Sequence, residues 1–338
     1  MTDEKKKVTL ALQGGGAHGA FTWGVLDAFL EDGRLDVIGI SGASAGAMNA
    51  VVYADGLREG GPARARAQLQ EFWRTVSLGG DLSKAQRELC DMVFGFWDPL
   101  KLRKTIAQNA ANYFSPYEFN PLDINPLRDL IDGLVDFTAL RATDNLKLFI
   151  SATNVRTGKV RIFRRPELTI DMLMASACLP TLFQAVEVEG EAYWDGGYMG
   201  NPALFPLYTE TDCCDIILVQ INPVERDEIP RTSQEIMDRL NEITFNASLL
   251  HEFRAIDFVA RLIDAGRLKG THYKKVLLHL VEGGAAMKRF GADTKLDADY
   301  DFLRSLFDIG HEAGKAFLDE HYDAIGVTGT AQLKEQLV

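Results

Sequence analysis

The chain has 338 residues, of which 46% are hydrophobic and 25% charged, and its formal net charge is -12 at pH 7. This length and apolar content suffice to bury a sizeable core, in one large domain with an extension or in two closely packed domains. The negative charge argues against nucleic acid as a partner and against steady electrostatic attachment to anionic lipid surfaces.

The N-terminus and the cysteines bear on where the protein works. Residues 1–7 are charged and run directly into a strand-like segment, without the apolar stretch of a signal peptide. No run of 18 apolar residues occurs, so we expect no membrane span. The four cysteines, Cys90, Cys178, Cys213 and Cys214, have neither metal-ligand nor disulfide spacing. We therefore expect a cytoplasmic protein with reduced thiols.

The first predicted strand, residues 8–12, leads through a glycine-rich turn into a helix-like stretch. The turn contains Gly14, Gly15, Gly16, His18 and Gly19. The spacing Gly14-x-Gly16-x-x-Gly19 is also the fingerprint of dinucleotide-binding folds, with Asp36 as a conceivable ribose ligand. Backbone amides in such a turn bind any anion, including the oxyanion of a tetrahedral intermediate. The turn therefore indicates an anion site without identifying the anion.

A second strand, residues 36–41, is followed by Gly42-Ala43-Ser44-Ala45-Gly46 and a helix over 45–54. A Gly-x-Ser-x-Gly sequence between a strand and a helix has the context of a nucleophile elbow. Side chains at Gly42 and Gly46 would collide with the strand or the helix in so sharp a turn. Ser44 would lie at the helix N-terminus, where the helix dipole favours developing negative charge. The alternative is a serine that only caps the helix.

The middle of the chain predicts further alternating elements. Residues 64–76 are helix-like, Asn125 and Pro126 begin a helix that runs to about 135, and residues 146–154 and 160–163 form a hairpin. The aromatic segment 92–97, with Phe94 and Trp97, either belongs to the core or borders the site and touches a membrane. Contact with a lipid surface would then be transient and mainly apolar.

Asp195 ends a strand-like hairpin and is followed by Gly196 and Gly197. The two glycines let other backbone approach this carboxylate closely. Because Asp-Gly is also a common turn dipeptide, a purely structural role is the alternative. Residues 215–221, further along, form an apolar run typical of a buried strand.

From about residue 232 the pattern becomes mainly helical. Thr232 and Glu235 form a capping box that opens a long amphipathic helix. A strand-like segment follows at 275–282, and a second helix runs from about 299 to 324. We expect residues 211–338 to contain the last sheet strands plus a helical extension packed on the core. This extension is also compatible with a role in a substrate pocket or a homo-oligomer interface.

A serine hydroxyl needs a base to accept its proton before it becomes a useful nucleophile. Of the six histidines, His18 alone lies in the proposed site. The others are more simply explained as core or surface residues: His251, His272, His279, His311 and His321. Asp195 is better placed than any of these five.

The glycine-rich turn, the Gly-x-Ser-x-Gly elbow and the Asp-Gly-Gly sequence together resemble the patatin-like phospholipases, which carry these three motifs in this order. The resemblance covers roughly residues 8–210, including the segment 175–180 that precedes the aspartate hairpin in that family. It implies an α/β class of fold: three α/β/α layers around a mostly parallel sheet, here with a helical C-terminal extension. Residues 8–210 would be the catalytic domain.

The resemblance implies a Ser-Asp dyad in place of a triad. Ser44 would be the nucleophile, Asp195 the base, and the amides of Gly14, Gly15 and Gly16 the oxyanion hole. The predicted activity is hydrolysis of acyl esters, including lipids, through an acyl-Ser44 intermediate. An aspartate with its ordinary pKa near 3.9 is a weak base, so the site must raise that pKa or place the two oxygens very well.

Several questions stay open at this point. His18 stands where many family members have Arg or Lys, which leaves the charge at this position undecided. Neither calcium nor any other metal or cofactor is implied, because no acidic loop has ligand spacing. Two other classes of protein remain: an NAD-dependent oxidoreductase built on the glycine turn, and a non-catalytic scaffold with the same fold. The preference for a lipid head group and for an acyl length depends on the walls of the substrate pocket, which segments such as 81–124 and 232–270 would form.

Overall fold

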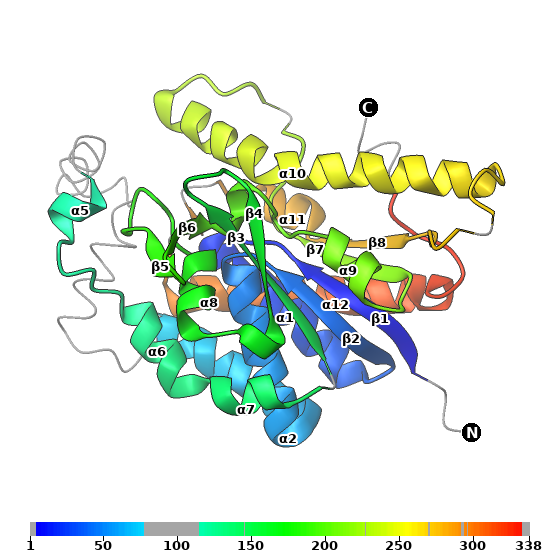
Figure 1. Ribbon diagram of the computed structural model, residues 1–338, viewed down its shortest axis with the longest axis horizontal. Helices are drawn as coiled ribbons and strands as arrows, with labels where there is room; N and C mark the ends of the chain where they lie inside the picture. Colours follow the sequence, from blue (N-terminus) through cyan, green and yellow to red (C-terminus); the bar gives the residue numbers. More distant parts are fainter. Residues whose placement is uncertain are drawn as a thin grey trace.

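The computed structural model describes residues 5–77, 115–144, 146–226, 228–269, 271–291, 294–295 and 297–332. Cys90 and the aromatic segment 92–97 lie outside these residues. Within them, eight strands form one sheet in the order β5-β6-β3-β2-β1-β7-β8, with β4 paired to β3 (Figure 1). The strands are β1 (Lys6–Leu12), β2 (Leu35–Gly42), β3 (Lys147–Asn154), β4 (Val160–Arg164), β5 (Val186–Val188), β6 (Glu191–Asp195), β7 (Asp215–Gln220) and β8 (Leu277–Glu282).

Helices occupy most of the remaining described residues. The α-helices are α1 (Gly19–Asp32), α2 (Ala45–Val76), α5 (Pro116–Phe119), α6 (Pro126–Leu134), α7 (Phe137–Ala142), α8 (Ile170–Ser176), α9 (Phe205–Glu210), α10 (Ser233–Asp264), α11 (Gly284–Lys288) and α12 (Tyr300–His321). Short 3-10 turns are η1 (Gly16–His18), η3 (Arg165–Glu167), η4 (Gly196–Tyr198) and η6 (Tyr322–Ala324).

The centre of the sheet is parallel. Strands β3, β2, β1, β7 and β8 run in one direction, whereas β4 and β6 pair antiparallel with β3 and β5 pairs antiparallel with β6. Leu12 at the end of β1 pairs with Gly42 at the end of β2. Because both strands finish at the same edge, the glycine-rich turn and the serine elbow emerge side by side.

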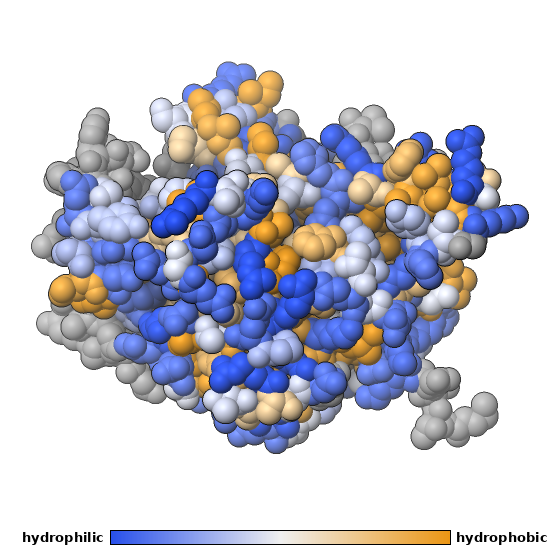
Figure 2. Space-filling model, viewed as in Figure 1, coloured by the Kyte–Doolittle hydropathy of each residue, from blue (hydrophilic) through white to orange (hydrophobic). Residues whose placement is uncertain are grey.

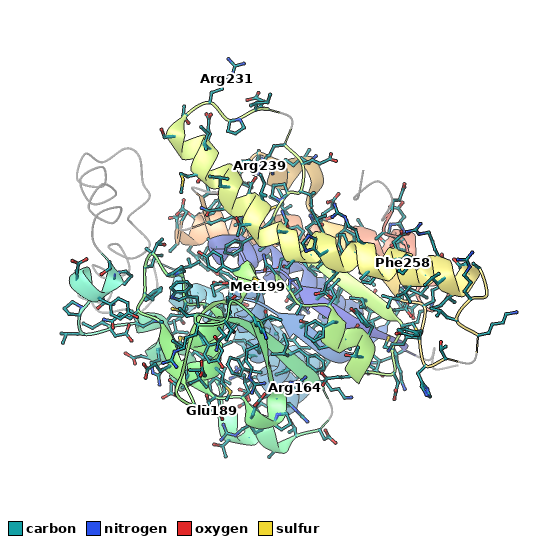
Figure 3. The ribbon with its side chains drawn as sticks, turned by 45° about the horizontal axis from the view of Figure 1, so that its top comes forward. Arg164, Glu189, Met199, Arg231, Arg239 and Phe258 are labelled. Carbon is teal, nitrogen blue, oxygen red and sulfur yellow. The ribbon has the colours of Figure 1, made fainter. Side chains whose placement is uncertain are left out.

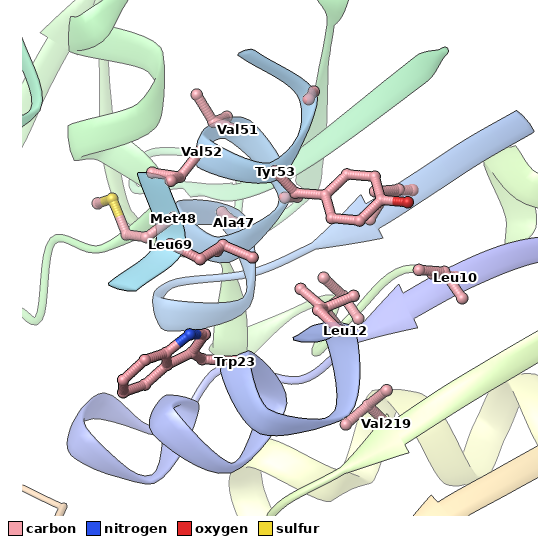
Figure 4. Packing of buried hydrophobic residues seen from close by; sticks show 14 of the residues in the cluster. Leu10, Leu12, Trp23, Ala47, Met48, Val51, Val52, Tyr53, Leu69 and Val219 are labelled. Atoms are coloured by element: carbon pink, nitrogen blue, oxygen red, sulfur yellow. The ribbon is translucent and has the colours of Figure 1, made fainter. Parts of the chain in front are cut away.

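Both faces of the sheet are covered by helices. Leu10 and Leu12 pack with α1, α2 and α12 in one cluster, and Figure 4 shows part of it around Leu12, Trp23 and Met48. Ala11, between them, belongs to a second cluster with side chains of α9 and α10. Since successive side chains of a strand point to opposite faces, this division separates two helical layers. The predicted three-layer α/β/α fold is confirmed.

The local predictions agree with the helix boundaries. Helix α2 bends at Gly60 and Gly61, just before Pro62, so the predicted helices 45–54 and 64–76 are its two arms. Asn125 accepts a hydrogen bond from Leu127 N and caps α6. The capping box at the start of α10 is present as expected.

Residues beyond 210 complete the sheet and both helical layers. Strand β7 pairs with the free edge of β1, and β8 pairs with β7. Helix α12 packs along α1 on one face, and α10 crosses the other (Figure 1). Among the described helices, none combines the length and apolar character needed to cross a bilayer. Cys178, Cys213 and Cys214 are free thiols.

Candidate active site

Strand β3 brings Asp195 to the serine elbow. Strand β2 pairs with β3 as far as Gly42 opposite Ile150, while β4 occupies the other edge of β3. Past the end of β2, β6 takes over the same edge and places Asp195 opposite Ala152. The elbow and Asp195, far apart in the sequence, therefore meet at one edge of one strand.

Ser44 has a backbone conformation that L-amino acids rarely adopt, with φ 51° and ψ -124°. Its amide donates to both the carbonyl oxygen and Oγ of Ser176, at 3.1 and 3.0 Å. Its hydroxyl makes no capping hydrogen bond to α2. A non-glycine residue at positive φ, anchored by its own amide, is typical of a nucleophile elbow and does not fit a simple helix cap.

Glycines let three chain segments converge on Ser44. A Cβ on Gly42 would lie 2.7 Å from the backbone of Gly46, and one on Gly46 would overlap the carbonyl oxygen of Leu12. A Cβ on Gly14 would lie 2.7 Å from Cβ of Ser44. Real Cβ atoms do not approach so closely, so the glycine turn can touch the elbow only because Gly14 and Gly46 carry no side chains.

Asp195 is completely buried. Its Oδ1 accepts a hydrogen bond from Gly197 N at 2.7 Å, whereas Oδ2 has no hydrogen-bond partner among the described residues. Burial raises the pKa of this carboxyl to about 7, against smaller lowering effects of the Gly197 amide and the Ser44 side chain. The carboxyl is thus a much stronger base than an exposed aspartate.

The Ser44 and Asp195 side chains are neighbours that the structure does not join directly. Ser44 lies close enough to lower the pKa of Asp195, but no hydrogen bond of good geometry connects the two groups. Hydrogen bonds of catalytic groups are often loose before substrate binds and tighten in the complex. Oδ2 of Asp195 is therefore left without a hydrogen-bond partner among the described residues.

The segment 175–180 holds both residues. Ser176, at the end of α8, fixes the amide of Ser44, and the carbonyl oxygen of Cys178 accepts the amide of Asp195 at 2.8 Å. Thr153 Oγ1 donates to the Asp195 carbonyl oxygen at 2.8 Å. The sequence indicated this segment by resemblance alone; the hydrogen bonds show that it binds the backbone amides of both Ser44 and Asp195.

The amides of the glycine turn are not equivalent. Gly14 N donates to Asn201 Oδ1 at 2.7 Å, so its amide is already occupied. The amides of Gly15 and Gly16 make no hydrogen bond to the described residues. Of the three predicted oxyanion donors, these two are available.

Buried amide side chains that sequence reasoning missed hold this turn in place. Gln13 Oε1 accepts from the amides of Ile221 and Asn222, both at 2.9 Å, and Gln13 Nε2 donates to Asn246 Oδ1 at 3.1 Å. Asn222 Nδ2 donates to the Gly14 carbonyl oxygen at 2.7 Å. Their only sequence signal is a polar amide close after an apolar strand: Gln13 follows β1 directly, and Asn222 comes two residues after β7.

His18 is neutral. Its ring is buried against Phe290 and Phe302, and Nε2 lies 2.7 Å from Thr294 Oγ1. Burial first, then the positive charges of Lys295 and Arg226, lower the pKa of His18 to about 3. The charge that many family members carry at this position is therefore missing here.

The other histidines lie apart from the dyad candidates. His279 is buried on β8, with Nε2 3.0 Å from Asp215 Oδ1 and Nδ1 3.1 Å from Thr330 Oγ1, so it ties the C-terminal segment to the sheet. His251 is exposed on α10. Neither contacts Ser44 through any described hydrogen bond.

One cluster has the residue types of a metal site. Ligand atoms of Asp27, Glu31 and His311 lie within 4.8 Å of one another, between α1 and α12. However, the Arg66 guanidinium donates to both carboxylate oxygens of Asp27, at 2.8 and 2.9 Å. Lys315 lies 3.8 Å from Glu31. Because these side-chain cations already neutralise Asp27 and Glu31, we interpret the cluster as an ion-pair network.

The proposed ribose ligand of a dinucleotide is displaced from the glycine turn. Asp36 is the second residue of β2 and pairs with Lys7. The turn, in contrast, follows the carboxyl end of β1. Since β1 and β2 are parallel, Asp36 and the turn lie at opposite ends of the strands. This geometry removes the residue that supported the nucleotide alternative.

Fold and site together define an α/β protein with a strained serine elbow beside a glycine turn and a buried aspartate. The family model described as patatin-like phospholipase matches residues 10–208. The chain therefore belongs to this family of lipid hydrolases, as the three motifs predicted.

Among solved structures, the chain is similar to VipD from Legionella pneumophila, with 16% identity over 90% of this chain and 67% of that one, and a TM-score of 0.37. It is also similar to a chain of the heterodimeric ExoU-SpcU complex from Pseudomonas aeruginosa, with 21% identity over 73% of this chain and a TM-score of 0.34. In this second case it spans only 51% of the other chain. The comparison with curated proteins gave no match.

Proposed function

We propose that the protein is a serine acyl-ester hydrolase that acts on lipid esters with Ser44 as nucleophile and Asp195 as base. The observation that carries the proposal is the pairing of a strained serine with a buried carboxyl whose Oδ2 is unpaired. A pKa of about 7 lets this carboxyl accept a proton at neutral pH and return it later in the same cycle.

In the first half of the proposed reaction, Ser44 Oγ attacks the ester carbonyl carbon and its proton passes to Asp195 Oδ2. The carbonyl oxygen becomes negative and accepts hydrogen bonds from the amides of Gly15 and Gly16. The bond to the leaving alcohol then breaks, and the alcohol takes the proton from Asp195. The product on the protein is an acyl-Ser44 ester.

Water completes the cycle. Asp195 accepts a proton from the attacking water, and the acyl-Ser44 ester passes through a second oxyanion in the same turn. When the bond to Ser44 Oγ breaks, Asp195 returns the proton to the serine and the fatty acid leaves. No cofactor takes part in any of these steps.

The surface beside the site supports an apolar acyl substrate. The edge of Phe245 on α10 packs against Gly197, two residues after Asp195, and Figure 3 shows Met199 next to this helix. Hydrophobic side chains gather over the amino-terminal half of α10 (Figure 2). These exposed residues are Ile236, Met237, Leu240 and Ile243. Scattered exposed apolar residues are common, but a row on one helix beside a reactive site suits a lipid substrate.

The test is hydrolysis of p-nitrophenyl esters from acetate to palmitate by the wild type, Ser44→Ala and Asp195→Asn. We expect each substitution to lower kcat by at least about 1000-fold, because nucleophile and base act as a unit. His279→Ala is the control, assayed at a temperature at which it remains folded, and should keep its activity. A well-folded but inactive His279→Ala would contradict the dyad.

The same assay, combined with the melting temperature measured with and without NADH, separates the alternative functions. Turnover that depends on Ser44 would exclude a non-catalytic scaffold, and its optimum acyl length would measure the pocket. If no ester reacts at any length and NADH raises the melting temperature, the nucleotide alternative gains. If no ester reacts and NADH has no effect, the scaffold alternative gains.

A further inference from the structure

A segment outside the family match lies against the glycine turn. A Cβ on Gly16 would overlap the carbonyl oxygen of Lys295, so the two backbones are in contact. The neighbouring residue, Thr294, bonds His18 at 2.7 Å. Residues 294–295 therefore form part of the wall behind the proposed oxyanion donors, although the family model ends at residue 208.

The Lys295 ammonium connects to that turn through one amide side chain. Lys295 Nζ donates to Asn222 Oδ1 at 2.7 Å, and Asn222 Nδ2 donates to the Gly14 carbonyl oxygen at 2.7 Å. The Gly14 carbonyl and the Gly15 N–H belong to the same peptide group. A chain of two hydrogen bonds thus runs from the positive charge to the peptide group that carries the Gly15 amide.

We propose that Lys295 is a positioning residue for ester hydrolysis, acting through Asn222 to orient and polarise the peptide group that presents Gly15 N–H to the oxyanion. This inference rests on the proposed function. A cation at one end of a hydrogen-bonded chain strengthens the bonds further along it. Donors fixed in advance at the developing oxyanion account for much of the rate of acyl transfer.

Neither of the neighbouring basic residues, His18 and Arg226, is suited to polarise this peptide group. His18 is neutral, and Arg226 forms an ion pair with the buried Glu242 at 2.6 Å. Of the charged groups that face Lys295, Glu242 and Asp238 favour its charged form and Arg226 opposes it. Burial is the largest influence and lowers the pKa of Lys295 to about 8. The ammonium is therefore charged at pH 7 and loses its charge as the pH rises through 8.

The experiment compares wild type, Lys295→Met, Lys295→Arg and the exposed control Lys288→Met, with kcat and KM measured from pH 6 to 10. We expect Lys295→Met to lower kcat by roughly 10- to 100-fold with little change in KM, less than the loss of a donor itself. Lys288→Met removes the same charge a few residues away and should behave like the wild type.

The pH profile supplies the readout that a merely structural role would not move. Wild-type kcat should fall above pH 8 as Lys295 deprotonates. Lys295→Arg keeps its charge, so it should recover most of the activity and remain active to higher pH. If Lys295→Met proves too unstable to assay, Lys295→Gln serves instead, with the same expected loss of kcat.

The outcomes also separate this inference from the proposed function. If Lys295→Met or Lys295→Gln has the same kcat as the wild type, and turnover depends on Ser44, the role of Lys295 is overturned and the proposed hydrolase function stands. Equal loss of kcat in the Met and Arg variants would also overturn it, because the charge would then not matter. Absence of Ser44-dependent turnover in the wild type would remove both proposals.

Discussion

Asp195 shows at the residue scale how a buried carboxyl opposes stability. Its carboxyl is wholly buried, one oxygen accepts a single amide, and the other oxygen has no described partner. Burying an ionised carboxylate without full pairing is costly, and the raised pKa measures that cost. Because the folded protein binds the Asp195 proton more tightly than the unfolded chain does, ionisation of this group destabilises the fold.

Asp195→Asn should therefore stabilise the protein more at pH 8 than at pH 5. The folded pKa of about 7 lies above the ordinary value of 3.8, so wild-type stability falls as the pH rises between these two values and then levels off. Asparagine does not ionise, and its advantage should grow by roughly 2.5 kcal/mol between pH 5 and pH 8. Urea denaturation at both pH values measures the difference; a constant advantage would contradict the buried, proton-binding carboxyl.

At the element scale, the crossing of α1 and α12 depends on the absence of side chains. A Cβ on Gly24 would overlap the carbonyl oxygen of Phe307, and a Cβ on Gly310 would overlap that of Phe21. Two helices approach so closely only where glycine removes the side chains between them. This contact fixes the position of α1. Because η1 of the glycine turn leads directly into α1, it also supports the turn.

Gly310→Ala should destabilise the protein by about 1–3 kcal/mol, because the added methyl group must push the two backbones apart. Gly133→Ala is the matched control: it makes the same chemical change within α6, where no atom lies within 4 Å of the new Cβ. Alanine in an open helix position should stabilise by up to about 1 kcal/mol. Urea denaturation of both variants measures the two changes in the free energy of unfolding. Similar effects at the two sites would show that helix propensity, not the α1–α12 contact, decides the outcome.

For the whole molecule, the sequence predicted what depends on neighbouring residues and missed what depends on distant ones. Gly42, Ser44 and Gly46 were readable because a sharp strand-to-helix turn restricts residue types within five positions. The alternation of strands and helices indicated the sheet and its layers for the same local reason. Asn222 and Lys295 were not readable, because a polar residue after a strand or in a loop acquires its role only when the chain folds.

The division of the chain near residue 210 stays a prediction, and a truncated protein tests it. A chain that ends at Glu210 lacks β7, which pairs with β1, and α12, which packs on α1. Gln13 also loses its partners on Ile221 and Asn222. We expect this chain to be aggregated or without fixed tertiary structure, as judged by near-ultraviolet circular dichroism and urea denaturation, and to lack ester hydrolysis. A cooperatively folded, active fragment 1–210 would show that the motif-bearing part is independent.

The buried amide side chains of Gln13, Asn222 and Asn246 around the glycine turn have a consequence for protein engineering. Transplanting the glycine turn, the elbow and the Asp-Gly-Gly sequence into another α/β scaffold would transfer the three motifs without Gln13's partner Asn246 or the pair formed by Asn222 and Lys295. Such a chimera would place the serine beside a glycine turn whose backbone amides are no longer held in one position. Successful grafts would also need to import these contacts, which come from residues beyond 210.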